Sequence, residues 1–67
     1  MSTIKLVVDL LGGQIKAAKA IGVAQQAVFK WVKEEMPISA KSATAIEKAT
    51  NGAVTRAEIR PDIFGSV

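Results

Sequence analysis

Residues 14–32, QIKAAKAIGVAQQAVFKWV, decide the fold of this chain. They predict two short helices, one over 14 to about 21 and one over about 24 to 32. Gly22 stands between them, where the first helix must stop in a left-handed conformation that is costly for any residue with a Cβ atom. Ala18 lies four residues before that glycine, where a small side chain lets two helices approach closely.

Four apolar side chains are expected to form the wedge that fixes the crossing of these two helices: Ile15, Ile21, Val23 and Val28. A small residue four positions before a glycine, an apolar turn and a β-branched core residue are together typical of a DNA-binding helix-turn-helix. In that motif the second helix enters the major groove of duplex DNA. This stretch therefore predicts a partner as well as a local fold.

The remaining segments also predict short helices. Residues 3–11 carry a helical stripe of apolar positions, namely Ile4, Val7, Val8 and Leu11. Their β-branched content also permits a strand. We favour a helix because Gly12-Gly13 would stop it and because no other segment offers a clear pairing partner.

The second motif helix is expected to end before Pro37, since the residue before a proline, Met36, avoids the helical region, and a further helix should follow. Ser39 can cap it, Ala43 and Ile46 should face inward, and Asn51-Gly52 should close it with the glycine at the C′ position.

Residues 55–58, TRAE, form a capping-box sequence, in which a threonine and a glutamate satisfy each other's free amides. Val54 and Ile59 fall at the positions of a hydrophobic staple for the same helix. Pro61 should end that helix near Arg60. The C-terminal helices are thus expected over about 39–64, after a helix-turn-helix over about 14–33.

A chain of 67 residues predicts one domain, 1–67, with one small core. Cysteine and histidine are both absent from the sequence, and no carboxylates are placed to converge. We therefore expect neither an enzyme nor a metal or other cofactor. No apolar run approaches ~20 residues, and the first residues do not resemble a signal peptide, so a cytoplasmic protein is expected without a membrane partner.

The net charge of +3 is unevenly distributed. Residues 1–33 contain five lysines and one aspartate, whereas residues 34–67 contain four basic and five acidic residues. The basic half is the half that carries the helix-turn-helix, and this polarity suits a polyanion. The alternative is that these lysines only solvate helix faces.

The first turns of the second motif helix are where such helices meet base edges. The residues expected to contact bases are Gln25, Gln26, Phe29 and Lys30. Glutamine can bond adenine N6 and N7 together, although two exposed polar residues need no partner. For Phe29 two alternatives stay open: contact with a thymine methyl or a sugar, or burial under the N-terminal helix.

The residues expected to contact phosphates are Gln14, Lys16, Lys19 and Lys33, with Lys30 able to reach a phosphate or a guanine. Gln14 opens the first motif helix, whose free amides and dipole favour an anion. Solvation alone is the alternative for each lysine.

Trp31, the only tryptophan, is predicted to lie in the core or to form the wall of a hydrophobic groove. Ile63 and Phe64 are expected either to cover Trp31 or to carry a dimer contact. Glu34 and Glu35 are interpreted as a solvated helix end.

Residues 13–32 resemble the helix-turn-helix of phage Cro repressors. The matching positions are Gln14, Lys16, Ala18, Lys19, Gly22, Val23, Gln25, Ala27 and Lys30. Residues 46–64, IEKATNGAVTRAEIRPDIF, are similar to the helical branch of that superfamily, including prophage Cro-like regulators and the YdaS-like antitoxin group.

The resemblance implies an all-α, compact, five-helix, lambda-repressor-like domain. It implies a bacterial or phage-encoded homodimer, assembled weakly or only on DNA, that binds palindromic operator DNA in the nucleoid and represses transcription. The alternative that it leaves open is an antitoxin whose main partner is a toxin protein.

Overall fold

Six short helices make up most of residues 3–65, the part of the chain that the computed structural model describes. They are α1 (Thr3–Leu11), α2 (Gln14–Ile21), α3 (Gln25–Val32), α4 (Ala40–Ala49), α5 (Arg56–Ile59) and α6 (Pro61–Phe64). The described residues contain no strand, so the all-α prediction is confirmed, whereas the prediction of five helices is wrong by one. None of these helices has the length and apolar character needed to cross a membrane.

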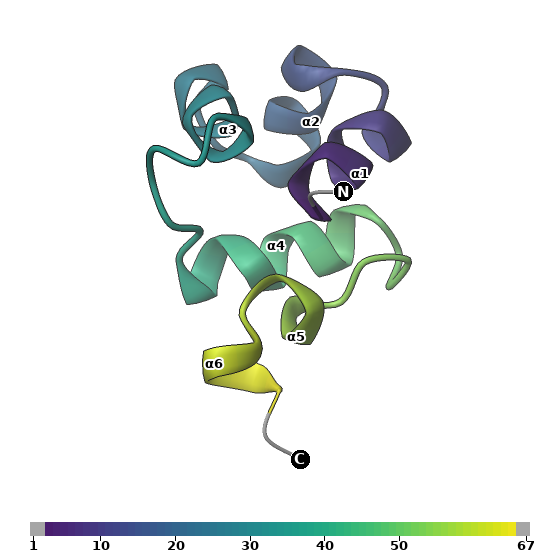
Figure 1. The fold of residues 1–67 in the computed structure, drawn as a ribbon. Helices are drawn as coiled ribbons and strands as arrows, with labels where there is room; N and C mark the ends of the chain where they lie inside the picture. Colours follow the sequence, from purple (N-terminus) through teal and green to yellow (C-terminus); the bar gives the residue numbers. More distant parts are fainter. Residues whose placement is uncertain (1–2, 66–67) are drawn as a thin grey trace.

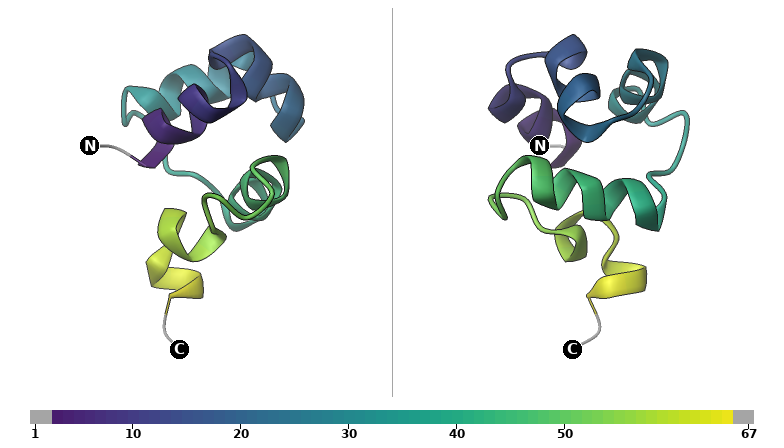
Figure 2. Two further views of the ribbon diagram at one scale, coloured as in Figure 1. Left: turned by 90° about the vertical axis from the view of Figure 1, so that its right-hand side faces the viewer. Right: turned by 180° about the vertical axis from the view of Figure 1, so that it is seen from behind.

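The helices are arranged in two groups around α4 (Figures 1 and 2). The first group consists of α1, α2 and α3, which pack against one another, and α4 lies below them in contact with α2. The short α5 contacts α4 and α1, and α6 follows α5 on the side of α4 that faces away from α3.

The core lies where these helices meet. Ile46 of α4, Val7 of α1, Val28 of α3 and Val54 are fully buried, and Trp31 is 4% exposed. Each lost side chain of this kind would leave a cavity, so the small core depends on all of them. The apolar stripe of α1 is confirmed, because Ile4 and Val7 are buried and Val8 and Leu11 pack against the cluster.

The turn between α2 and α3 forms as predicted. Gly22 has a φ of +87°, and the Gly22 and Val23 amides both donate to the Ala18 carbonyl, at 2.9 and 3.0 Å. The prediction for Ile15 is wrong, since its side chain is 56% exposed. Ile15 lies in the first turn of α2, and its side chain borders a surface hollow beside Lys16 and Gln25 instead of entering the core.

The caps of α4 and α5 are confirmed. The Ser39 hydroxyl accepts from the Ser42 amide at 3.2 Å. The Thr55 hydroxyl accepts from the Glu58 amide while the Glu58 carboxylate accepts from the Thr55 amide, which completes the capping box.

The prediction that Gly52 takes the C′ position at the end of α4 is wrong by one residue. Asn51, with a φ of +53°, is the first left-handed residue after the C-cap Thr50, and Gly52 follows it. The Asn51 amide donates to the Lys48 carbonyl and the Gly52 amide to the Glu47 carbonyl, the bonds of a Schellman motif. Asparagine tolerates this conformation better than most residues, which is why it can precede the glycine here.

Helix α5 ends at Ile59 as Pro61 predicted, but Pro61 also begins α6, because proline suits the first position of a helix. Arg60 holds this junction. Its guanidinium donates to both oxygens of Asp62, at 3.0 and 2.7 Å, and to the Ile38 carbonyl before α4, at 2.6 Å. These hydrogen bonds raise the pKa of Arg60 and lower the pKa of Asp62 from their ordinary values.

The expectation that Ile63 and Phe64 cover Trp31 is wrong, because α6 and α3 lie on opposite sides of α4 (Figure 1). Phe64 lies instead under the Arg56 guanidinium, 5.0 Å from it, and Ile63 is 46% exposed.

Candidate nucleic-acid interface

The outer face of α3 carries the residues that are predicted to contact bases, together with Lys33. Val28 and Trp31 point into the core, so the remaining face of the helix is turned to solvent. The exposed residues on that face are Gln25, Gln26, Phe29, Lys30 and Lys33. Their spacing of one, three or four positions brings them onto neighbouring turns of the helix, where they form one continuous surface.

The structure excludes one of the two alternatives for Phe29. The ring is 44% exposed and does not belong to the core, so burial under the N-terminal helix is wrong. The Lys33 ammonium lies 4.5 Å from the ring centroid, which is a cation–π geometry. Phe29 and Lys33 therefore form one partly apolar, positively charged unit at the surface.

Helix α2 contributes the second part of this surface. A hollow of about 490 Å³ is lined by Gln14, Ile15 and Lys16, by Gln25 from α3, and by the turn that precedes α2. The Lys16 side chain lies over that turn. Its Cδ is 3.0 Å from the position that a Cβ atom on Gly12 would occupy. The tertiary structure thus brings the start of α2 and the start of α3 together.

Both of these helix starts lack a side-chain cap. Gly13 before α2 and Ala24 before α3 offer no side-chain hydrogen bond to the first amides, whereas Ser39 and Thr55 cap α4 and α5. Free amides at a helix N-terminus, together with the helix dipole, favour an anion such as a phosphate. The two uncapped starts border the same hollow.

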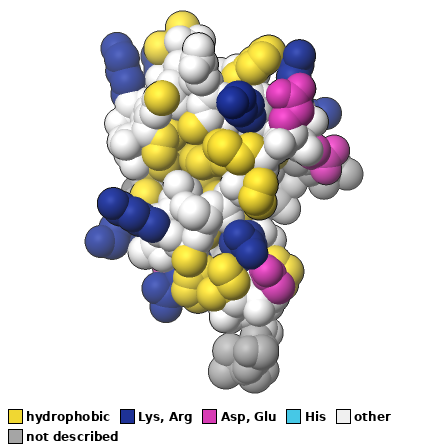
Figure 3. Space-filling model, turned by 90° about the vertical axis from the view of Figure 1, so that its left-hand side faces the viewer, with side chains coloured by type: hydrophobic (Ala, Val, Ile, Leu, Met, Phe, Trp, Pro, Cys, Tyr) yellow, Lys and Arg dark blue, Asp and Glu magenta, His cyan; other side chains and the backbone are white. Residues whose placement is uncertain are grey.

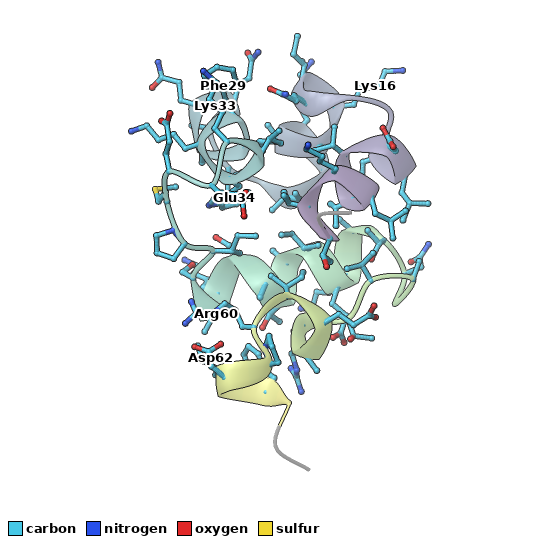
Figure 4. All side chains as sticks on the ribbon, viewed as in Figure 1. Lys16, Phe29, Lys33, Glu34, Arg60 and Asp62 are labelled. Atoms are coloured by element: carbon cyan, nitrogen blue, oxygen red, sulfur yellow. The ribbon has the colours of Figure 1, made fainter. Side chains whose placement is uncertain are left out.

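Figure 4 shows that Lys16 on α2 and Phe29 and Lys33 on α3 lie at one end of the molecule, and that Arg60 and Asp62 lie at the other. Gln14 is half-buried and Lys19 is exposed. Within the described residues, none of the predicted site side chains makes a hydrogen bond or ion pair with another part of the chain. Their donors and charges are available to a partner.

Ile15 also belongs to this surface, although it was predicted to form part of the apolar wedge between the two helices. Its exposure beside Gln14, Lys16 and Gln25 puts an apolar group at the edge of the candidate interface.

The comparisons with known proteins agree with a regulator. A family model described as "Bacterial toxin YdaS" matches residues 4–67. The chain is 41% identical over 54 residues to the "Putative transcriptional regulator YdaS" of Escherichia coli strain K12, an alignment that covers 81% of this chain and 55% of the relative. The chain thus spans little more than half the length of that relative. No solved structure matches the chain.

Proposed function

The chain belongs to the bacterial toxin YdaS family, and from this membership and the surface formed by α2 and α3 we propose that it is a sequence-specific, DNA-binding transcriptional repressor without enzymatic activity. The observation that carries the proposal is the continuous outer face of α3, whose glutamines, phenylalanine and lysines are exposed and make no hydrogen bond or ion pair within residues 3–65, beside two uncapped helix starts. The name of the E. coli relative supports the same class of function.

In the proposed complex, residues 24–33 lie in the major groove of operator DNA. Gln25 and Gln26 bond base edges, and Phe29 packs on a thymine methyl or a sugar. Lys30 contacts a base or a phosphate. The start of α2 meets the backbone, where Gln14, Lys16 and the free amides hold a phosphate, while Lys19 and Lys33 add charge.

We propose further that two copies bind together. Two recognition helices that read one face of a duplex require half-sites ~34 Å apart, about one helical turn. A core this small is consistent with copies that pair weakly in solution and assemble on the operator. A dimer seated on a promoter excludes polymerase.

The decisive experiment selects bound sequences from a pool of random duplexes at near-physiological salt. An enriched inverted repeat with half-sites one turn apart is the expected result, and it would identify the operator. Binding without an enriched motif would leave only backbone electrostatics and would overturn sequence-specific repression.

Two substitutions test the separate roles of bases and phosphates. Gln26→Ala should weaken binding to the selected operator by ~1–3 kcal/mol and leave binding to random DNA nearly unchanged. Lys19→Ala should weaken both and reduce the salt dependence of binding. Equal losses on operator and random DNA for Gln26→Ala would rule out base reading.

A second candidate is an antitoxin that binds a toxin protein and uses DNA binding for autoregulation; the printed family description names a toxin and so supports only the toxin–antitoxin setting of this candidate. This candidate predicts a stoichiometric protein partner that co-purifies with the chain from its host. Enrichment of an operator together with a monomeric or dimeric mass and no such partner would favour the repressor.

A further inference from the structure

A second hollow, of about 470 Å³, lies on a different part of the molecule from the candidate DNA interface. Its walls come from the start of α1, the end of α3, the segment that joins α3 to α4, and α5. Apolar side chains form much of its lining, including Ile4, Trp31, Met36 and Ile59. Four separate segments therefore converge on an open, apolar depression that the proposed DNA contacts do not use.

Trp31 lines this hollow and also carries a hydrogen-bond donor that the fold leaves unpaired. The side chain is 4% exposed, and its Nε1 is a buried atom that has no hydrogen-bond partner among the described residues. A buried N–H group without an acceptor is unfavourable, and native structures rarely leave one unpaired. Because Nε1 itself is covered, Trp31 offers an entering ligand its ring and not this N–H group.

Three carboxylates also line the hollow: Glu34, Glu35 and Glu58. Glu58 is engaged in the capping box through one oxygen, which leaves the other free. Glu34 and Glu35 are exposed and make no side-chain hydrogen bond or ion pair with residues 3–65. On the face seen in Figure 3, acidic side chains stand at the edge of an exposed apolar band.

Glu34 adds a reason to regard this arrangement as more than a solvated helix end. It is the left-handed residue that terminates α3, with a φ of +60°, where a glycine would avoid the conformational cost. Figure 4 shows Glu34 below α3, facing α4 and away from Phe29 and Lys16. The left-handed turn at Glu34 therefore lies directly beside the hollow.

We propose that this hollow docks an apolar peptide segment of a protein partner that carries lysine or arginine. An aliphatic side chain of the segment packs on Trp31 and Ile59, and its cation pairs with Glu34 and Glu35. Charge complementarity supports this occupant, because three carboxylates repel phosphate and attract a cation. The proposal does not depend on DNA binding, since the two surfaces share no residue.

A second copy of this chain is a less suitable occupant. The net positive charge of the chain is concentrated in residues 1–33. Those residues include the lysines of the candidate DNA interface, so a second copy docked through them would cover that interface. A separate partner that approaches from the acidic side leaves α3 free.

The single tryptophan makes the test direct, because the indole N–H proton of Trp31 gives one resonance in the NMR spectrum of the whole chain. We would titrate the chain with the peptide acetyl-Leu-Lys-Leu-Lys-Leu-amide and, as a matched control, with acetyl-Leu-Glu-Leu-Glu-Leu-amide. The expected result is a saturable shift of the indole resonance with the basic peptide only. No saturable shift up to about 10 mM peptide, or equal shifts with both peptides, would overturn the proposal.

Substitutions in the protein test which carboxylates pair with the lysines of the peptide. The double substitution Glu34→Gln and Glu35→Gln should weaken the basic peptide about fivefold, while the control Asp9→Asn, an exposed carboxylate on α1, should leave its affinity unchanged. Equal affinity in the double variant would overturn the pairing. If the indole resonance shifts with protein concentration alone and the mass doubles, the occupant of the hollow is a second copy of this chain and not a segment of another protein.

Discussion

The two parts of the molecule on either side of Pro37 are stabilised by different interactions. All side-chain hydrogen bonds found in the described chain, and its one ion pair, lie between Ile38 and Asp62. Residues 3–37 contribute most of the buried apolar side chains but none of these bonds. The N-terminal part is assembled by apolar packing, and the C-terminal part adds a network of local polar contacts.

This difference indicates which part of the molecule can bind a partner. In residues 38–62, hydroxyls and carboxylates cap helices and join loops, so they are occupied by the fold itself. In residues 3–37, packing leaves the amides and ammonium groups of α2 and α3 without internal partners. A surface that must bind another molecule keeps its polar groups free, and the C-terminal part provides the support on which that surface rests.

The largest expected effect comes from the side chain that joins the two parts. Ile46 is fully buried between them, so Ile46→Ala should lower the free energy of unfolding by about 3 kcal/mol through lost contacts and a cavity. Urea denaturation would measure the loss. The matched control is Ile15→Ala, at a side chain that is 56% exposed and should cost less than about 1 kcal/mol. Similar losses for the two isoleucines would contradict the burial pattern.

The polar network of the C-terminal part is tested at Thr50. Its hydroxyl lies within hydrogen-bond distance of the carbonyls of Ile46 and Val54 and accepts from the Val54 amide at 3.2 Å. Thr50→Val keeps the shape but leaves that amide unpaired, so it should cost about 1–2 kcal/mol in thermal or urea unfolding. Thr44→Val is the control, since the Thr44 hydroxyl only bonds the Ala40 carbonyl within its own helix. If both substitutions cost the same, the Thr50 bridge contributes nothing.

A stabilising change is expected at Glu34, where the N-terminal part ends. Because its φ is +60°, Glu34→Gly should raise the free energy of unfolding by about 1 kcal/mol. The adjacent Glu35→Gly should not stabilise, since Glu35 is not in the left-handed region and a glycine there only adds disorder to the unfolded chain. Equal effects of the two glycines would show that the conformation of Glu34 costs nothing.

The smallest effect concerns pH and the Arg60–Asp62 pair. The pair lowers the pKa of Asp62, so its contribution to stability is complete above the ordinary aspartate pKa of about 4 and disappears as pH falls through the lowered value. The stability difference between the natural chain and Asp62→Asn should therefore be constant from pH 7 to about 5 and shrink in more acidic solution. In an Arg60→Gln background, Asp62→Asn should lose this pH-dependent effect; its persistence would assign the effect to another group.

The sequence predicted the helix boundaries closely because the signals that set them act over at most a few residues. Ser39 and Thr55 bond amides three positions away, and Gly22 ends its own helix. The helix-boundary predictions failed where two local signals competed. Asn51 took the position assigned to Gly52, and Pro61 began a helix as well as ending one. The DNA-contact assignments of Gln26 and Lys19 remain predictions that the proposed substitutions test.

The order of the helices, the turn at Gly22 and the outward face of α3 could be predicted from the amino-acid sequence, because each follows from helical periodicity and a nearby cap. Helix packing, in contrast, brings Ile15 and Gln25 to the edge of one hollow and brings Arg60 to the Ile38 carbonyl 22 residues away. The same is true of Glu34 and Glu58, which meet across an apolar depression lined by Trp31. Such contacts depend on how whole helices pack, and no spacing within a single segment encodes them.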